Sequence, residues 1–489
     1  MSDTQLVSRL PALRWRKAWL QIDQKQSSIE FAKTNRGVFV LHAAFITLMA
    51  LSQHFSNARL GLIALTIIAI AIVPKKRVPI IVGASVFYIF VRPFRVEGWV
   101  NLLNAKVLTL TEDISTLMLQ MMAVGAFFAF SFFYLKSMKW PATALISKRP
   151  VVSLSLIWAI FVLAALLVPD HSFIDAFLWT FSGVLISSLW VLAYAALDQK
   201  GRDPTPIGAR NGFMRPFWGG SATPIGKSFG YLNKFDAKSS DELAVTRLKA
   251  IKLATWALIL TGLMHVLEFI ARDYYNLPQL QNTILAHASG KSFSASINWL
   301  SLIYNYFIDL VIISVWGHFI VATIRMVGYR IPRNTCNPLA ARTIAEFWNR
   351  YFFYFKELLV DIFFYPAFVR YFKSIPKLRI VFATFCAAGF GNFFYHFSRD
   401  TFQFAYMPFL EALAIFQSAA VYSILLASGL VFSQLNPFKP KPKDGFFRYE
   451  LVTRLNVISF FCFVKIFDDI SGEGSVMERA AFTVDLFRF

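Results

Sequence analysis

The sequence predicts an all-α polytopic membrane protein with about eleven transmembrane or re-entrant helices. The first observation is composition: 56% of the 489 residues are hydrophobic and 16% are charged, whereas soluble proteins contain about 25% charged residues. The second is a set of six apolar runs, each close to the roughly 20 residues that cross a bilayer. They are residues 116–135, 151–168, 173–197, 253–270, 299–324 and 407–432.

Charge is the third observation. The net charge is +21, which in a soluble domain would indicate nucleic-acid binding. Here the basic residues lie between the apolar runs, where cytoplasmic loops of membrane proteins carry them. We therefore expect membrane lipids and no nucleic acid as partners. The three cysteines show neither a CxxC spacing nor a metal-binding pattern, so we expect neither a disulfide framework nor a metal.

The chain begins with a basic segment, residues 1–36, in which leucines and tryptophans alternate with arginines. This pattern is typical of a helix that lies on the membrane surface. A disordered basic tail agrees with the sequence equally well. The segment is too polar for a cleavable signal peptide.

The remaining chain divides into four parts. Residues 37–197 form the N-terminal transmembrane helices, 198–252 a cytoplasmic loop, 253–468 the transmembrane core and 469–489 a C-terminal tail. The eleven helices are expected at 37–52, 57–73, 78–92, 116–135, 151–168, 173–197, 253–270, 299–324, 378–397, 406–433 and 451–468.

The distribution of Lys and Arg predicts the orientation. Eleven alternating spans place nearly all basic loops on one side, which predicts a cytoplasmic N-terminus. Arg92, Arg95 and Lys106 are the exception, because they fall on the opposite side. In the 198–252 loop, five aromatic side chains are expected to fold the segment back toward the membrane: Phe213, Phe217, Trp218, Phe229 and Tyr231.

The segment 338–372 mixes aromatic residues with charge. A helix is expected from about Leu339, and Glu346 and Arg350 lie four residues apart on it, the spacing of an ion pair. Lys356 and Asp361 follow among apolar residues. Charge is costly beside hydrocarbon, so we expect this segment to re-enter the protein or lie at the interface.

These residues resemble the membrane-bound O-acyltransferases, in particular the bacterial branch that acylates polysaccharides and cell-wall polymers. The resemblance rests on Glu346-Phe347-Trp348-Asn349-Arg350-Tyr351, then Asp361, then Phe364-Tyr365-Pro366, with His396 on the following helix. It covers about 55 residues closely. The chain departs from the pattern at Phe352, where the family usually has His or Asn, and His396 stands in Tyr-His-Phe instead of Trp-His-Gly.

The resemblance implies a central tunnel and transfer of an acyl group from a thioester donor to a hydroxyl. The donor would be an acyl-CoA or an acyl-carrier thioester, and the acceptor a polysaccharide, a lipid or a metabolite. No bound cofactor or metal is expected. The location would be the bacterial cytoplasmic membrane. His396 would be the general base, since an imidazole can take the hydroxyl proton near neutral pH.

Other residues are expected to support this chemistry. Asn392, one turn before His396, shares its helical face and would orient the imidazole or donate to the oxyanion, and Gly389 and Gly391 would loosen that helix. Further tunnel-lining or supporting residues are His318, Asn349 and Asp361. Donor-side anchors are Glu346, Trp348, Arg350 and Lys356; for Glu346 and Arg350, a purely local ion pair is the competing interpretation.

Two other classes of function remain open. A transporter or channel would use ionisable residues within its spans, and Asp309, His318 and Glu411 are available for that purpose, although no internal repeat is visible. A noncatalytic relative of the acyltransferases that binds lipid would account for Phe352. The residue types alone do not separate these alternatives.

Overall fold

The computed structural model describes residues 19, 21–110, 114–141, 143–201, 203–219, 225–436, 440–469 and 473–488. Every regular element in these ranges is a helix, in agreement with the predicted fold class. Most of the basic segment 1–36 lies outside the described residues. Its described part contains α3 (Gln26–Lys33), which meets α4 (Asn35–Leu51) at a bend of 94°.

The N-terminal half continues as a series of helices. Ser115, Ser172 and Ser239 cap α8, α11 and α14 by accepting a bond from a first-turn backbone amide. The helices are α5 (Asn57–Ile72), α6 (Arg77–Val91), α7 (Glu97–Leu108), α8 (Thr116–Ser137), α9 (Leu145–Lys148), α10 (Pro150–Leu167), α11 (Phe173–Lys200), α12 (Ile207–Gly212), α13 (Phe229–Lys234) and α14 (Ser240–Glu268).

The C-terminal half contains shorter helices between two long ones. The α-helices are α15 (Leu280–Ala288), α16 (Ala295–Met326), α17 (Ile344–Tyr351), α18 (Phe353–Leu359), α19 (Tyr365–Arg370), α20 (Pro376–Thr384), α21 (Asn392–Arg399), α22 (Phe409–Ile415), α23 (Gln417–Leu435), α24 (Thr453–Lys465) and α25 (Val476–Asp485). Wider π-helical turns extend or join several of them: η2 (Phe269–Tyr274), η4 (Val360–Phe364), η5 (Phe385–Gly391) and η8 (Phe447–Val452).

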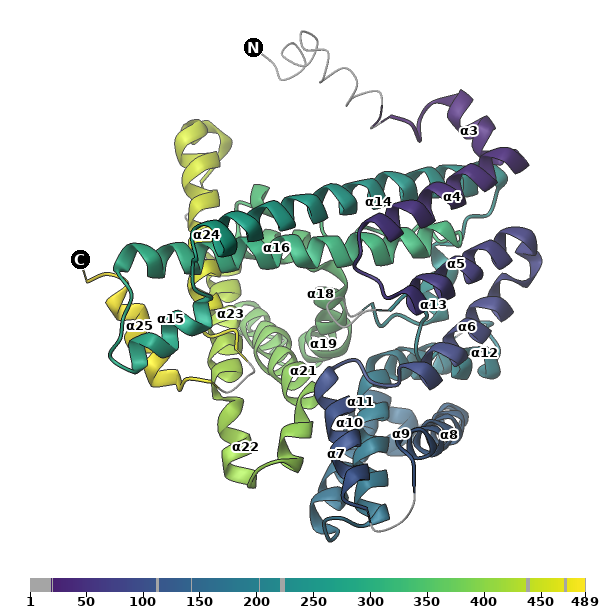
Figure 1. Ribbon diagram of the computed structural model, residues 1–489, viewed down its shortest axis with the longest axis horizontal. Helices are drawn as coiled ribbons and strands as arrows, with labels where there is room; N and C mark the ends of the chain where they lie inside the picture. The colour runs from purple at the N-terminus through teal and green to yellow at the C-terminus, as the bar shows by residue number, and fades with distance from the viewer. Residues whose placement is uncertain are drawn as a thin grey trace.

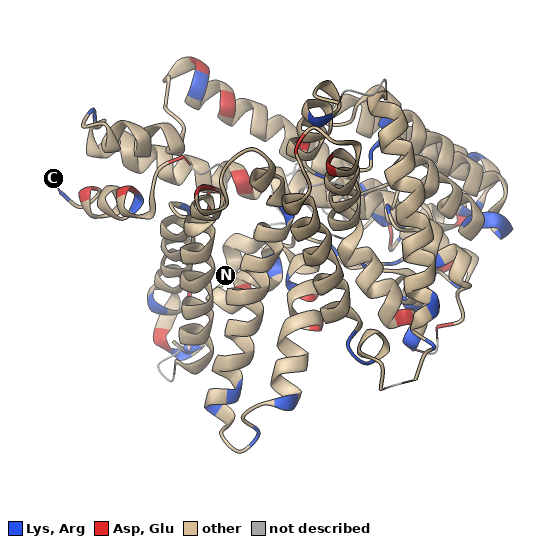
Figure 2. Ribbon diagram, turned by 90° about the horizontal axis from the view of Figure 1, so that it is seen from below, with Lys and Arg blue, Asp and Glu red and all other residues tan. Residues whose placement is uncertain are grey.

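The chain is a polytopic membrane protein. Seven helical stretches are long and apolar enough to cross a bilayer, and the bent α3–α4 pair is an eighth candidate. The seven are Thr116–Ser137, Pro150–Leu167, Phe173–Lys200, Ser240–Tyr274, Ala295–Met326, Pro376–Arg399 and Phe409–Leu435. The long helices show extended stretches without a charged residue (Figure 2).

The expected number of eleven is only partly matched. A helix occupies each of the eleven predicted places. However, α5, α6 and α24 have 16, 15 and 13 residues, and at 1.5 Å per residue such helices are shorter than the hydrocarbon core of about 30 Å. Hydropathy gave the bounds of α5 and α6 within one residue and overestimated the length of α24.

Two groups of packed helices can be followed in Figure 1. The long helices α14 and α16 pack side by side, and α3 and α4 lie against α14. The helices α8, α10 and α11 pack together as a second group. Helix α11 is the most buried of the spans, because 89% of its apolar window is covered by protein. It therefore runs through the interior and positions the segments around α21.

The segment expected as the loop 198–252 is folded into the protein. Phe213, Phe217, Trp218 and Phe229 are at most 2% exposed, which confirms that the aromatic side chains fold this segment inward. The loop is also shorter than predicted, because α14 begins at Ser240 and not near residue 253. Asp241 and Glu242 in its first turn interact favourably with the helix dipole.

Candidate functional site

The helix that carries His396 is interrupted by the π-helical segment η5, directly before α21. This is the place where Gly389 and Gly391 predicted a loosened helix. The reason is close packing: a Cβ on Gly391 would lie 2.7 Å from a ring carbon of Phe363. Only glycine permits this approach, and the wide turn therefore fixes how α21 lies against η4.

His396 lies deep in the protein, yet its side chain keeps partial exposure. Its Nδ1 is buried without a hydrogen-bond partner, and no hydrogen bond to Nε2 is present among the described residues. Its ring stands edge-on to Tyr422 of α23, with ring centroids 6.4 Å apart. The charges of Arg399, Asp468 and Lys465 act on it. Neither ring nitrogen therefore has a hydrogen-bond partner among the described residues.

Asn392 is fully buried, and neither its amide oxygen nor its amide nitrogen has a hydrogen-bond partner among the described residues. The expected bond between Asn392 and His396 is therefore absent. Buried amides without partners are uncommon and costly. The same helical face thus presents two unpartnered polar side chains one turn apart.

The other histidines have clearer structural roles. His42 Nδ1 bonds the Val38 carbonyl at 2.7 Å, and exposed His265 lies 3.7 Å from Glu268 as an i, i+3 pair. His318 is 8% exposed and also has an unpartnered Nδ1. Its charged neighbours are Arg333 and Arg325, whereas His396 has a carboxylate among its neighbours.

A charged triad near His396 was missed by the sequence interpretation. Lys465 Nζ at the end of α24 lies 2.6 Å from Asp309 Oδ2 on α16 and 2.7 Å from Asp468 Oδ2. All three side chains keep between 21% and 32% of their surface exposed, although protein surrounds them densely. Asp309 was considered only for transport, and its partner lies more than 150 residues away, so the sequence carried no signal for the pair.

The segment 338–372 begins differently from the prediction. A single 3-10 turn, Pro338–Ala340, precedes α17, which starts at Ile344. Thr343 caps it by accepting a bond from the Glu346 amide at 3.0 Å. The sequence Thr-x-x-Glu is a known helix-start signal, and it would have placed this boundary correctly.

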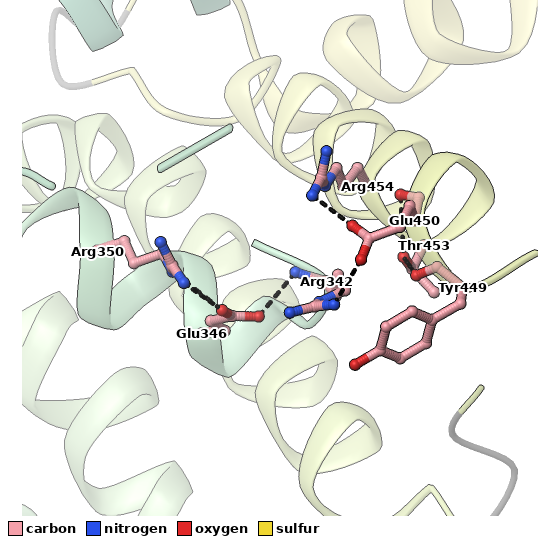
Figure 3. A network of polar contacts seen from close by, with 7 residues as sticks. All are labelled: Arg342, Glu346, Arg350, Tyr449, Glu450, Thr453 and Arg454. Carbon is pink, nitrogen blue, oxygen red and sulfur yellow. Dashed lines mark hydrogen bonds and ion pairs between the residues drawn. The ribbon is translucent and has the colours of Figure 1, made fainter. Parts of the chain in front are cut away.

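Two of the donor-side anchors, Glu346 and Arg350, belong to a polar network that extends through Arg342 to α24 and the turn before it (Figure 3). Arg350 contacts Glu346 through Nη2 at 2.7 Å and Nε at 3.0 Å, which confirms the local ion pair. Arg342 bonds Glu450 at 2.8 Å and stacks over Tyr449. Burial alone would raise the pKa of Glu346, but bonds from the Arg342 amide and the Arg350 guanidinium leave that pKa below its ordinary value of 4.5.

A cavity of about 230 Å³ lies beside this network. Its lining includes three predicted site residues, Trp348, Asn349 and Lys356, together with Ala387 and Ala388 of η5. Ala388 precedes His396 by eight residues, which corresponds to about 12 Å along a helix. The cavity and His396 therefore belong to one helical stretch.

Asp361 accepts hydrogen bonds from Lys227 and, at 2.8 Å, from the Tyr194 hydroxyl. Lys227 is 7% exposed, lies 4.5 Å from the Tyr194 ring centroid and 4.0 Å from Glu357. Lys356 bonds the other oxygen of Glu357. Asp361 thus anchors the inward-folded segment to η4, a contact that the sequence did not indicate.

Comparisons with known proteins add no family. A scan against protein-family models and a search of curated proteins each found no match. Among the described residues, no group of three or more His, Cys, Asp or Glu side chains is placed to hold a metal ion. The geometry around His396 and the sequence resemblance are therefore the observations that bear on function.

Proposed function

We propose that this membrane protein is an O-acyltransferase in which His396 acts as general base. The observation that carries the proposal is the state of its imidazole. The ring is deep in the protein, partly exposed, without a hydrogen-bond partner among the described residues, and near the carboxylate of Asp468. A structural histidine such as His42 instead bonds a backbone carbonyl.

The chemistry follows from general acid–base catalysis. His396 takes the proton of the acceptor hydroxyl while the oxygen attacks the thioester carbonyl. The carbon–sulfur bond then breaks and the thiolate leaves, accepting the proton from the imidazolium. The unpartnered amide of Asn392, one turn away, has an N–H available for the oxyanion that forms during this step.

The cavity beside α17 is the candidate entrance for the thioester donor. Its walls combine apolar residues of η5 with Trp348, and Lys356 lies at the same cavity. This composition suits an acyl chain with a polar attachment. Arg342, Arg350 and Lys356 each have a carboxylate partner. We therefore assign Arg342 and Arg350 to holding α17 in place and not to binding the phosphates of an acyl-CoA, and Lys356 pairs with Glu357 within α18.

The hydroxyl acceptor would reach His396 from the side away from this cavity, through a tunnel that continues past α21. The triad of Lys465, Asp309 and Asp468 then borders the acceptor. Charged groups that keep partial exposure within a membrane protein mark a path for polar molecules. A polysaccharide, a lipid hydroxyl and a hydrophilic metabolite all fit this description.

The test is acyl transfer by the purified protein, with labelled acyl-CoA and a panel of hydroxyl acceptors. His396→Ala should lower transfer about 10²–10⁴-fold, the usual effect of losing a general base. His265→Ala is the matched control, because His265 is exposed and distant in sequence. His318→Ala should retain most activity.

Three results would contradict the proposal in different ways. Full activity in His396→Ala would remove the proposed base. Substrate flux into proteoliposomes without acylation would indicate a transporter instead. Binding of acyl-CoA without transfer to any acceptor or hydrolysis would indicate a noncatalytic protein.

A further inference from the structure

Three basic residues stand out because they are the exceptions to the charge pattern predicted from eleven spans. Lys106 is explained by the fold: it is buried and pairs with Asp175 at 2.7 Å and Asp170 at 3.0 Å. Arg92 and Arg95, in the turn after α6, have no carboxylate partner among the described residues. These two arginines therefore carry positive charge that the described protein does not neutralise.

A third arginine joins them from the inward-folded segment. Arg215 follows α12 and is 6% exposed. Its guanidinium donates to the carbonyl oxygens of Arg92 at 3.3 Å and Phe94 at 2.9 Å. A carbonyl oxygen accepts a hydrogen bond but carries no net charge. The positive charge of Arg215 therefore adds to those of Arg92 and Arg95.

A fourth arginine increases the charge nearby. Arg59 of α5 is 7% exposed and donates to the carbonyl oxygens of Trp218 and Gly219. Burial, followed by the positive charges of Arg95, Arg92 and Arg59, lowers the pKa of Arg215. Placing these cations close together in the protein therefore costs free energy.

Two other buried cations of this chain have carboxylate partners, whereas buried Arg325 donates, among the described residues, to the Ile331 carbonyl alone. Lys252 pairs with Asp23, and Arg479 pairs with Asp469, as buried charges usually require. Glu97 is the acidic residue nearest to Arg95 in sequence. It is exposed and forms no ion pair with a described residue. Glu97 therefore does not neutralise the positive charge of Arg92 or Arg95.

The arginines reach from the surface to a small internal space. Arg92 is exposed and Arg95 is partly exposed. Arg95 lines a cavity of about 20 Å³, enough for roughly one water-sized group, and its Nε is buried without a partner. Polar side chains that share this cavity are Ser187, Tyr395, Ser398 and Arg399. Tyr395 is hydrogen-bonded with Arg95, and Arg399 is paired with Asp400 at 2.7 Å.

We propose that Arg92, Arg95 and Arg215 form a binding site for a phosphate group. Guanidinium groups match phosphate oxygens in planar, two-point contacts. Phosphate offers more acceptor oxygens than a carboxylate, which suits three arginines gathered at one turn. Arg95 lines the small cavity with an unpartnered Nε, and Arg215 is held at the same turn by its bonds to the carbonyls of Arg92 and Phe94. The phosphate belongs either to an anionic lipid headgroup or to a free phosphate ion. This site does not depend on acyl transfer.

The test uses the full-length protein, purified in neutral detergent and delipidated. Its thermal midpoint is measured with phosphatidylglycerol, with phosphatidylcholine and with inorganic phosphate at matched ionic strength. Native mass spectrometry counts bound phosphatidylglycerol. Arg215 is left intact because its bonds to the backbone hold the turn. The variants are Arg92→Gln and Arg95→Gln, and Arg149→Gln is the control, since it removes an exposed charge elsewhere.

An increase in the midpoint with phosphatidylglycerol and with inorganic phosphate, but not with phosphatidylcholine, identifies the phosphate group itself. An increase with phosphatidylglycerol alone identifies a lipid headgroup. In both cases Arg92→Gln and Arg95→Gln should weaken the apparent Kd about tenfold, and Arg149→Gln should not change it. Equal responses of all variants, or no preference for either anion over phosphatidylcholine, would overturn the site.

Discussion

The ammonium group of Lys465 lies 2.6 Å from the carboxylate of Asp309 and thereby joins α24 to α16. Asp468 lies on the other side of the same ammonium, at 2.7 Å. One cation thus faces two anions. Removing the cation and removing one of the anions therefore have different consequences. Loss of the lysine leaves two adjacent carboxylates, whereas loss of Asp309 leaves one intact pair.

This asymmetry gives the first prediction. Lys465→Gln should destabilise the protein by on the order of 2 kcal/mol, because it leaves partly buried anions unpaired. Asp309→Asn should cost clearly less. The measurement is the thermal midpoint of each variant in the same detergent. The double variant Asp309→Asn/Lys465→Gln should be more stable than Lys465→Gln alone, and a strictly additive loss would contradict the coupling.

The contact between Gly391 and Phe363 gives the second prediction. In Gly391→Ala, the new methyl group would lie 2.7 Å from a Phe363 ring carbon. Either that ring or the wide turn must shift, with an expected cost of about 1–3 kcal/mol. Because η5 positions His396, acyl transfer should fall as well.

Gly389→Ala is the matched control for this substitution. Its methyl group would lie 3.5 Å from Phe385, an ordinary contact distance. Both glycines lie in η5 and both variants gain the same group, so helix propensity cancels in the comparison. Equal midpoints for the two variants would show that the Phe363 contact does not constrain the turn.

The third prediction concerns pH. The pKa of Glu346 lies below its ordinary value of 4.5, so its charged form is favoured by folding. Its contribution to stability is then present above that ordinary value and is lost as pH falls through the lowered one. Glu346→Gln should lower the midpoint at pH 7 by a small amount, since the side chain is 29% exposed. The difference from wild type should shrink below pH 4.5; a difference that persists in acid would exclude the ion pair as its source.

Composition and hydropathy were sufficient for the all-α membrane class and for the approximate places of the eleven predicted helices. Charged residues at i, i+4 were sufficient for Glu346 and Arg350. These features are local, and local sequence patterns report them directly. Phe352 departs from the acyltransferase pattern; in the structure it lies between α17 and α18 and packs on Phe355.

The ion pairs that shape the candidate site were not predictable in this way. Lys465 and Asp309 are separated by more than 150 residues, and Lys227 and Asp361 by more than 130. Such pairs depend on which helices pack together, which no local pattern determines. For Asn392, helical spacing correctly gave a place one turn before His396; of its two expected roles, the hydrogen bond to the imidazole does not form and the donation to an oxyanion stays a prediction.

The cavity beside α17 gives the fourth prediction, which tests whether the cavity can hold a larger side chain. Ala388 lines the cavity, so Ala388→Leu places its added carbons in free volume and should change the midpoint little. Ala383, one turn earlier, is completely buried outside the cavity. There the same substitution should overpack the interior at a cost of about 1–3 kcal/mol. If the cavity admits the thioester donor, Ala388→Leu should also raise the KM for acyl-CoA without a matching loss of stability. Equal destabilisation by both substitutions would show that the cavity has no room for a side chain.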